Sequence, residues 1–207
     1  GRGGGLYVET GSPTIRNVHF LRNGGYLGGG AFNGAGTAPL FEGIIFEQNY
    51  SVGGGGAYNQ GGTLRFIDCR FEKNRTSGGG GLATEGGVSV LTRVSFLANE
   101  ADGGGGIINY MGGALLCIDC TFQGNAALTD GGAVYDELST STLVRARFVG
   151  NTAAVGGALY TVSESALVCV GCTFESNRAN GAGGAAFARE GTITFVNTVF
   201  LGNTSTA

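Results

Sequence analysis

The sequence predicts an all-β fold, a right-handed parallel β-helix of about eight coils, and a strict internal period is the main reason. A Phe is followed three residues later by an Asn eight times, and successive Phe residues lie 25 or 26 positions apart. A period that constant is typical of one structural unit stacked on copies of itself. The pairs are Phe20/Asn23, Phe46/Asn49, Phe71/Asn74, Phe96/Asn99, Phe122/Asn125, Phe148/Asn151, Phe174/Asn177 and Phe200/Asn203.

Composition favours strands and turns over helices. The 207 residues include 43 Gly, 2 Pro and no Trp, and the Gly clusters between short apolar runs. No apolar period of 3.6 residues and no helix capping signal occurs. A hydrophobic fraction of 42% with 13 Phe and 7 Tyr indicates a packed core rather than a disordered linker. Because the period is unbroken, we expect residues 1–207 to form a single domain, a segment of a longer repeat protein.

One copy of the repeat, residues 53–77, shows the strands and turns that are predicted for each coil. A glycine cluster precedes a short strand at 57–59, and Gly61 and Gly62 form a turn. An extended run over 63–71 then ends at a bend at Asn74. This pattern predicts three short strands per coil of 25 to 26 residues, with each coil paired to the next through parallel ladders about 4.8 Å apart.

Equivalent positions in successive coils, counted back from each Phe, form columns that predict which side chains point inward and which point outward. Positions two and five before the Phe are small or apolar almost throughout, so both are predicted to point inward. The position three before the Phe is predicted to face out, and it holds Asn17, Gly43, Asp68, Arg93, Asp119, Arg145, Gly171 and Asn197. Alternating charge in that column predicts a ladder of exposed ion pairs.

The Asn of each repeat is predicted to point inward at a bend, where its amide can bond its own backbone and the Asn one coil away. Asn49, Asn74 and Asn203 stand in glycosylation sequons. An inward amide cannot carry a glycan, so these sequons are discounted.

In the first strand of each coil, the sequence does not decide whether one column of side chains points inward or outward. We predict that this column is core, although an outward aromatic strip that stacks on sugar rings or a partner is the alternative. The column is Tyr7, Phe32, Tyr58, Ala83, Ile108, Val134, Leu159 and Ala186.

A second half-motif, two Gly followed by Ala, Ile or Leu, alternates with the Phe-Asn motif along essentially the whole chain. It occurs as Gly29-Gly30-Ala31, Gly55-Gly56-Ala57, Gly80-Gly81-Leu82, Gly105-Gly106-Ile107, Gly131-Gly132-Ala133, Gly156-Gly157-Ala158 and Gly183-Gly184-Ala185. The combination resembles the repeat of the polymorphic outer-membrane proteins, whose surface-exported passenger domains resemble pectin-lyase-like β-helices. The resemblance implies an extracellular or cell-surface location and an adhesive or architectural role.

Net charge and hydropathy limit the classes of partner that we expect. The net charge is −3 and no run of like charges occurs, which argues against nucleic-acid binding. No apolar stretch of about 18 residues is present, so we expect no membrane insertion by this segment. A protein or glycan surface ligand and end-to-end self-association remain as expected partners.

The five cysteines include a CxxC pair at Cys117 and Cys120 and another at Cys169 and Cys172. This spacing suggests zinc out of context. The column assignment places Cys120 and Cys172 two coils apart, so four sulfurs cannot converge on one metal. We expect free, structural thiols and neither metal nor cofactor.

Candidate groove residues lie at the end of the first strand: Glu85, Tyr110, Asp136, Glu137, Arg189 and Glu190. Paired carboxylates there could act as general acid and base. His19, the single His, is predicted to face out, so no Ser-His-Asp triad can form. The sequence predicts no catalytic residues and a non-enzymatic role in adhesion or as a scaffold. The alternatives are a carbohydrate-active enzyme and a subunit of an end-to-end stacked fibre.

Overall fold

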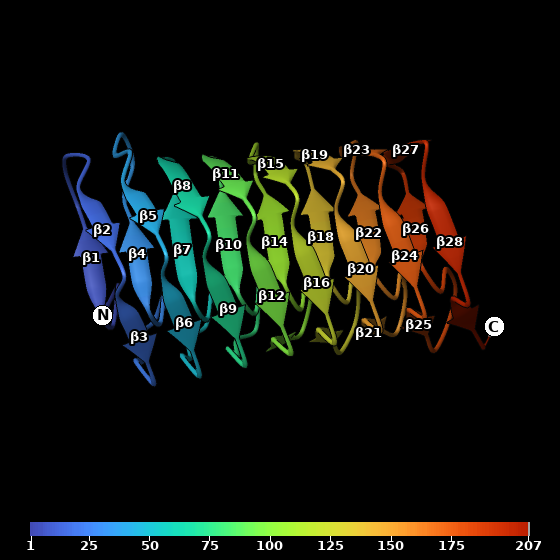
Figure 1. Cartoon of the computed structure of the whole chain (residues 1–207), viewed down its shortest axis with the longest axis horizontal. Coiled ribbons are helices and arrows are strands. Elements are labelled where there is room, and N and C mark those ends of the chain that lie inside the picture. The colour runs from blue at the N-terminus through green and yellow to red at the C-terminus, as the bar shows by residue number, and fades with distance from the viewer. Residues whose placement is uncertain (207) are drawn as a thin grey trace.

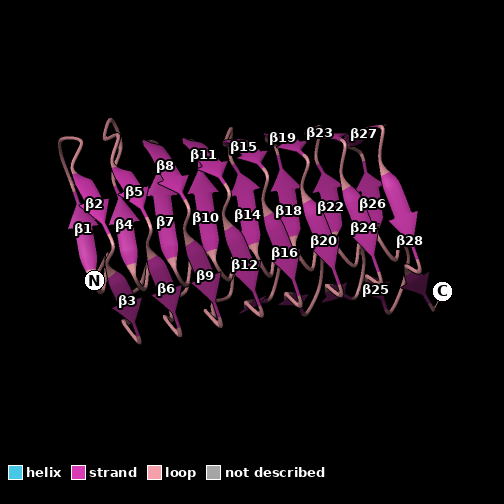
Figure 2. Ribbon diagram, viewed as in Figure 1, coloured by secondary structure: helices cyan, strands magenta, loops and turns pink. Residues whose placement is uncertain are grey.

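The computed structural model describes residues 1–206 and confirms the predicted β-helix. Eight coils follow one another along a single axis, and the two termini lie at opposite ends of the solenoid (Figure 1). Strands and loops make up all of the described chain (Figure 2), which therefore contains no helix able to cross a membrane. Ala207, the last residue of the predicted domain, lies outside the described residues.

Three eight-stranded parallel sheets run the length of the solenoid, one for each predicted strand of the coil. The first sheet contains β1 (Leu6–Val8), β4 (Ala31–Asn33), β7 (Ala57–Gln60), β10 (Leu82–Glu85), β14 (Ile107–Tyr110), β18 (Val134–Glu137), β22 (Leu159–Val162) and β26 (Ala186–Arg189). The second contains β2 (Thr14–Arg16), β5 (Leu40–Glu42), β8 (Thr63–Ile67), β11 (Val88–Thr92), β15 (Ala114–Ile118), β19 (Thr140–Val144), β23 (Ala166–Val170) and β27 (Thr192–Val196). The third contains β3 (His19–Leu21), β6 (Ile45–Glu47), β9 (Arg70–Glu72), β12 (Ser95–Leu97), β16 (Thr121–Gln123), β20 (Arg147–Val149), β24 (Thr173–Glu175) and β28 (Val199–Leu201).

A fourth, five-stranded sheet follows the Asn bend in the later coils and was not predicted. Its strands are two residues long: β13 (Glu100–Ala101), β17 (Ala126–Ala127), β21 (Thr152–Ala153), β25 (Arg178–Ala179) and β29 (Thr204–Ser205). In the earlier coils the equivalent residues make single bridges, such as Tyr50 to Arg75. Strands this short leave no periodic signal in the sequence.

The bend between the second and third sheets explains the column pattern. In every coil the residue three before the Phe has a positive φ, between 50° and 64°. A left-handed residue turns the chain sharply, so the side chains on both sides of it can point inward while its own points out. Gly, Asn and Asp, which tolerate this conformation best, hold six of the eight positions.

The Phe column forms the centre of the core, as predicted. Neighbouring rings stack with centroids 4.6 to 5.0 Å apart and interplanar angles of 3° to 10°. The columns two and five before the Phe pack around these rings in the internal coils, for example Val94 and Leu91 beside Phe96. The stack consists of Phe20, Phe46, Phe71, Phe96, Phe122, Phe148, Phe174 and Phe200.

The terminal coils depart from the predicted burial of these columns. Phe200 is exposed although it stacks on Phe174, because no further coil covers its other face. Val18 and Phe195 are exposed for the same reason at the two ends. The inward facing of a column therefore buries a side chain only where coils lie on both sides of it.

The Asn column forms a second continuous ladder, although one of its two predicted partners is wrong. The backbone N–H and the Nδ2 of Asn99 both donate to Oδ1 of Asn125, at 3.0 and 2.9 Å, which confirms the bond to the next coil. We expected the amide to bond the backbone of its own turn, and it does not. Nδ2 instead donates to the carbonyl of Phe71 in the preceding coil, at 2.9 Å. Each amide therefore bonds the coil on either side of it.

Internal members of the ladder repeat this geometry, whereas the two end members do so only in part. Nδ2 of Asn151 donates to Asn177 at 2.9 Å and to the Phe carbonyl of the preceding coil at 3.0 Å. Asn23 bonds Asn49 but has no preceding coil, and Asn203 bonds only the preceding coil, so both are partly buried rather than fully enclosed. The fully buried members, which include two of the sequon residues, are Asn49, Asn74, Asn99, Asn125, Asn151 and Asn177.

The core prediction for the open first-strand column is correct for Val134 and Leu159, which belong to the main core, but the column itself is wrong in two ways. Ile108 pairs with Tyr135 rather than Val134, so the true column continues through Tyr135, Tyr160 and Phe187. It lies on the outer face of the first sheet, in a cluster separate from the main core. The slip arises because Ala133 replaces the last Gly of the cluster. Gly104 and Gly131, which both have positive φ, are in register, so Ala133 corresponds to Gly106 and not to Ile107.

Candidate functional site

The predicted groove at the end of the first strands is only partly correct. Asp136 does not lie there: it points inward from β18 and is fully buried, because it occupies the same column as Asn59 and Asn109. Its Oδ1 accepts hydrogen bonds from Ser141 at 2.7 Å and from Asn109 at 3.2 Å, whereas Oδ2 has no partner. Burial raises the pKa of this carboxyl to about 6, against the opposing effect of those bonds.

Glu85 and Tyr110 do come together, through a residue that the sequence did not point to. The Tyr58 hydroxyl lies 2.5 Å from Glu85 Oε2 and 2.5 Å from the Tyr110 hydroxyl. Glu85 Oε2 also accepts a bond from Gln60 Nε2 at 3.1 Å. Because Tyr58 has one hydrogen and gives it to the carboxylate, Tyr110 must donate to Tyr58. Burial, followed by the bond to Glu85, raises the pKa of Tyr58.

The remaining candidates extend this outer face toward the C-terminus. Glu137 pairs with Tyr110 in register and Arg189 follows two coils later in the same column. Glu190 is exposed at the next turn and has a φ of 58°. Glu85 and Glu137 are thus two coils apart, roughly 10 Å at ladder spacing, with Tyr110 between them.

Exposed charges at the bend between the second and third sheets form the predicted ion-pair ladder. Arg93 binds both carboxylate oxygens of Asp68, at 2.7 and 2.8 Å. Arg145 holds Asp119 in the same way, at 2.7 and 2.9 Å. The arginine hydrogen bonds lower the pKa of each of these carboxyls. His19 is exposed, as predicted, and contacts Glu47 at 3.0 Å.

The five cysteines are free and buried. Cys120 and Cys172 belong to one column with Ala146 between them, as the sequence predicted. Burial raises the pKa of Cys69 to about 11 and that of Cys117 as well, so these thiols are neutral. Within residues 1–206, no three His, Cys, Asp or Glu side chains are grouped as a metal site would require.

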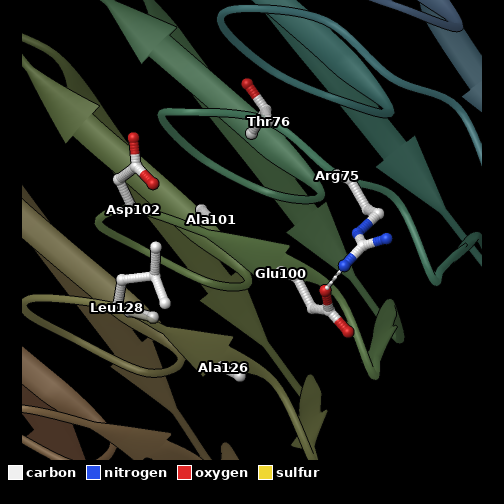
Figure 3. Close-up of a pocket in the computed structure, with 8 residues that line it drawn as sticks. Arg75, Thr76, Glu100, Ala101, Asp102, Ala126 and Leu128 are labelled. Carbon is white, nitrogen blue, oxygen red and sulfur yellow. Dashed lines mark hydrogen bonds and ion pairs between the residues drawn. The ribbon is translucent and has the colours of Figure 1, made fainter.

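Surface hollows concentrate at what we call the loop edge: residues 24–28, 50–54, 75–79, 100–104 and 126–131, which connect the third sheet to the first. One hollow of about 570 Å³ lies beside Tyr50 and Lys73, and a second of about 350 Å³ lies between Thr76 and Leu128. Both are lined by Arg75 and Glu100, so the two hollows adjoin each other at this pair. Figure 3 shows Arg75 and Glu100 joined by their ion pair on one side of the second hollow, with Asp102 and Leu128 on the other side.

Exposed aromatic and aliphatic side chains lie along the same edge. Tyr26 and Tyr50 are 62% and 61% exposed, and Leu128 is 76% exposed. The Tyr50 ring lies directly against the previous coil, since a Cβ added to Gly24 would collide with its Cζ. The ring is therefore held flat by the backbone, with its other face open.

The ion pair inside the hollow is free to rearrange. The side chains of Arg75 and Glu100 are 72% and 52% accessible to solvent. An ion pair this exposed contributes little stability, because water competes for both charges. The two side chains are therefore held together only weakly.

Sequence reasoning missed Tyr58, Gln60 and the whole loop edge. Tyr58 was in view only as a member of a column assigned to the core. The loop edge has variable sequence between the Asn and the Gly cluster, and its side chains gather only because consecutive coils stack.

Comparison with known proteins supports the fold. The profile of a family described as "Right handed beta helix region" matches residues 4–207. Neither curated proteins nor solved structures gave a match. The match spans nearly all of the chain and agrees with the parallel coils described above, and the chain therefore belongs to the right-handed β-helix family.

Proposed function

We propose that this protein is a non-enzymatic segment of an extracellular or cell-surface repeat protein, acting in adhesion or as a scaffold, and that the loop edge contacts its protein or glycan ligand. The loop edge is the observation that carries the proposal. It combines hollows with exposed Tyr26, Tyr50 and Leu128, whereas the outward bend column carries paired charges. Aromatic and apolar side chains grouped on a surface are characteristic of interaction sites.

The architecture supports the scaffold part of the proposal. Each coil bonds only its neighbours through sheets, Phe rings and Asn amides, so stability accumulates along the axis and leaves the outer surface free to vary. The resemblance to polymorphic outer-membrane repeats supports the surface location. It rests on the Phe-Asn and Gly-Gly motifs, which in this chain supply the core rings, the amide ladder and the bends.

Binding to arrays of extracellular glycans and matrix proteins tests the proposal. The chain should bind at least one ligand saturably, and the variant Tyr26→Ser/Tyr50→Ser/Leu128→Ser should weaken that binding by about tenfold or more. The variant Asp68→Ser/Arg93→Ser, which alters the ion-pair ladder instead, is the matched control and should bind normally. Equal losses in both variants would remove the loop edge from the proposal.

The competing function is hydrolysis or elimination on a polysaccharide, for which Glu85 and Glu137 are the available carboxylates. Their backbone spacing of roughly 10 Å is slightly larger than the separation between carboxyl groups in inverting glycosidases, about 6.5 to 9.5 Å. Incubation with a panel of neutral and acidic polysaccharides should release no new chain ends. Release that is lost in Glu85→Gln or Glu137→Gln would establish the enzyme and reject our proposal.

A further inference from the structure

A small cavity of about 160 Å³ lies between the outer face of the first sheet and the loop edge. Ala83 and Ile108 line it from the sheet, and Leu27 and Val52 line it from the loops. Val52 is 49% exposed and Tyr110 is partly exposed, so the cavity opens to the surface. It is separate from the two larger hollows, with which it shares no residue.

The cavity exists because an aromatic column is interrupted. On the outer face, Phe32 stacks on Tyr58 with centroids 5.7 Å apart, and Tyr135 stacks on Tyr160 at 5.3 Å. Between these two stacks the column holds only Ala83 and Ile108, which are smaller than a ring.

The loops above the sheet do not fill this space, because Gly78 has no side chain. A Cβ on Gly78 would meet only Ile108 Cδ1, at 3.8 Å. Two features of the sequence therefore leave the same volume open: the small residues in the aromatic column and the Gly that faces them.

Polar groups occur on one side of the cavity only. Tyr58 and Tyr110 both line it, and their hydroxyls lie 2.5 Å apart in the chain that ends on Glu85. Since Tyr110 donates its hydrogen to Tyr58, the Tyr110 oxygen keeps lone pairs that can accept a hydrogen bond. An occupant is therefore offered apolar walls and one acceptor.

We infer that this cavity binds a single phenol ring, presented by a tyrosine of a protein ligand, with the phenol hydroxyl donating to Tyr110. The volume is close to the roughly 150 Å³ of an apolar cavity that accepts benzene, so it admits one six-membered ring. A ring there would fill the gap in the aromatic stack. A pyranose fits less well, because its hydroxyls point in all directions and most would be buried without partners. The inference rests on the proposed function, since it requires a protein ligand at the loop edge.

Ligand-detected NMR titration with p-cresol, toluene and methyl β-glucopyranoside tests the inference. The protein should bind p-cresol saturably, toluene more weakly and the glucoside not at all. Gly78→Leu places a side chain in the cavity and should weaken p-cresol binding by about tenfold or more. Gly103→Leu, one coil along in register, is the matched control because its Cβ would lie near Thr129 and Tyr135 instead. It should bind within about twofold of the parent.

A second variant keeps the test independent of how Gly78→Leu folds. Tyr110→Phe removes the acceptor and should weaken p-cresol about fivefold, as expected for one neutral hydrogen bond, while leaving toluene binding unchanged. Absence of p-cresol binding, or binding of the glucoside as tightly as p-cresol, would overturn the inference. Either result would leave the loop-edge proposal standing, because its triple variant changes none of the cavity residues.

Discussion

Replacing Asp136 by Asn should stabilise the protein at neutral pH. Asp136 is fully buried on the inner face of β18, with one carboxylate oxygen unpaired. The equivalent position is Asn in β4, β7 and β14, so the fold already accommodates an amide there. The amide has no charge to desolvate, and its Nδ2 can donate to the unpaired Thr161 Oγ1 of the adjacent coil.

The magnitude follows from the pKa. Burial raises the pKa of Asp136 from 3.8 to about 6. At about 1.4 kcal/mol per pH unit, ionising this group costs the native state about 3 kcal/mol at pH 7. Because the native pKa is the higher one, Asp136 imposes no penalty below about pH 3.8. As the pH rises from about 3.8 to 6, the free energy of unfolding falls, because burial disfavours the ionised form of Asp136 in the native state. The loss remains at higher pH. Cys117 and Cys169, whose pKa values are raised, are neutral buried thiols that feel the charge of Asp136.

Thermal unfolding followed by circular dichroism at pH 3.5 and pH 7.5 measures this difference. The Asp136→Asn variant should melt roughly 6 to 12 °C above the parent at pH 7.5, at about 2 to 4 °C per kcal/mol for a chain of this size. The gain should nearly vanish at pH 3.5. Comparing the variant with its parent cancels Asp68 and Asp119, whose lowered pKa values destabilise both proteins in acid.

Asp102→Asn removes an exposed carboxylate and serves as the control, with an expected change within about 1 °C at either pH. A gain from Asp136→Asn that is equal at both pH values would show that charge is not the cause. A loss of stability at pH 7.5 would show that the buried carboxylate is compensated, and the reasoning would be refuted.

Three further predictions concern the core, the thiols and the ends. Phe96→Ala removes a ring from the middle of the stack and should lower the free energy of unfolding by about 3 to 5 kcal/mol in chemical denaturation. The exposed His19→Ala should change it by under about 0.5 kcal/mol. Similar effects of the two variants would contradict the predicted inward and outward columns. Treatment with EDTA should leave the melting temperature unchanged because the buried cysteines pack as apolar side chains, and stoichiometric zinc in elemental analysis would refute this. The 207-residue chain should self-associate with rising concentration in sedimentation, because Phe195 and Phe200 are 37% and 47% exposed on a coil with unpaired strand edges. A monomer at millimolar concentration would reject the fibre alternative.

The inward columns could be predicted because the period fixes them. Phe96, Asn99 and Leu91 recur at constant offsets, and a constant offset in a stacked coil means a constant position in space. The outward column was predictable for the same reason, including the contact between Asp68 and Arg93. Its left-handed backbone was not foreseen, since Arg93 gives no local signal for a positive φ.

The partners of the Asn column were harder to predict than its facing. A bond from an Asn side chain to its own turn is a common local arrangement, and the sequence offers no sign against it. In the stacked coils, the inward amides of Asn151 and Asn177 donate instead to the carbonyl of the Phe in the preceding coil. The period gives the direction of a side chain, but its partner depends on how closely the coils approach.

The first strand shows where counting from the motifs fails. The step from Asn to the first strand is eight residues for Asn99 and Ile107 but nine for Asn125 and Val134, so an offset counted from the nearest Gly pair shifts by one. A shift of one residue exchanges the two faces of a strand. This is why Tyr135 and Tyr160 were left out of the aromatic column and why Asp136 was placed outside.

The sequence by itself therefore determined the repeat, the parallel β-helix and the inward ladders, because these depend on spacing alone. Only the tertiary structure decided the loop edge, the cavity at Ala83 and the network of Tyr58, Glu85 and Tyr110. Each of these forms between residues of different coils, 27 positions apart for Tyr58 and Glu85 and 52 apart for Tyr58 and Tyr110, from positions that do not repeat. Their proximity depends on the register of the first sheet and on how far the loops fold over it, and neither is encoded by a local pattern.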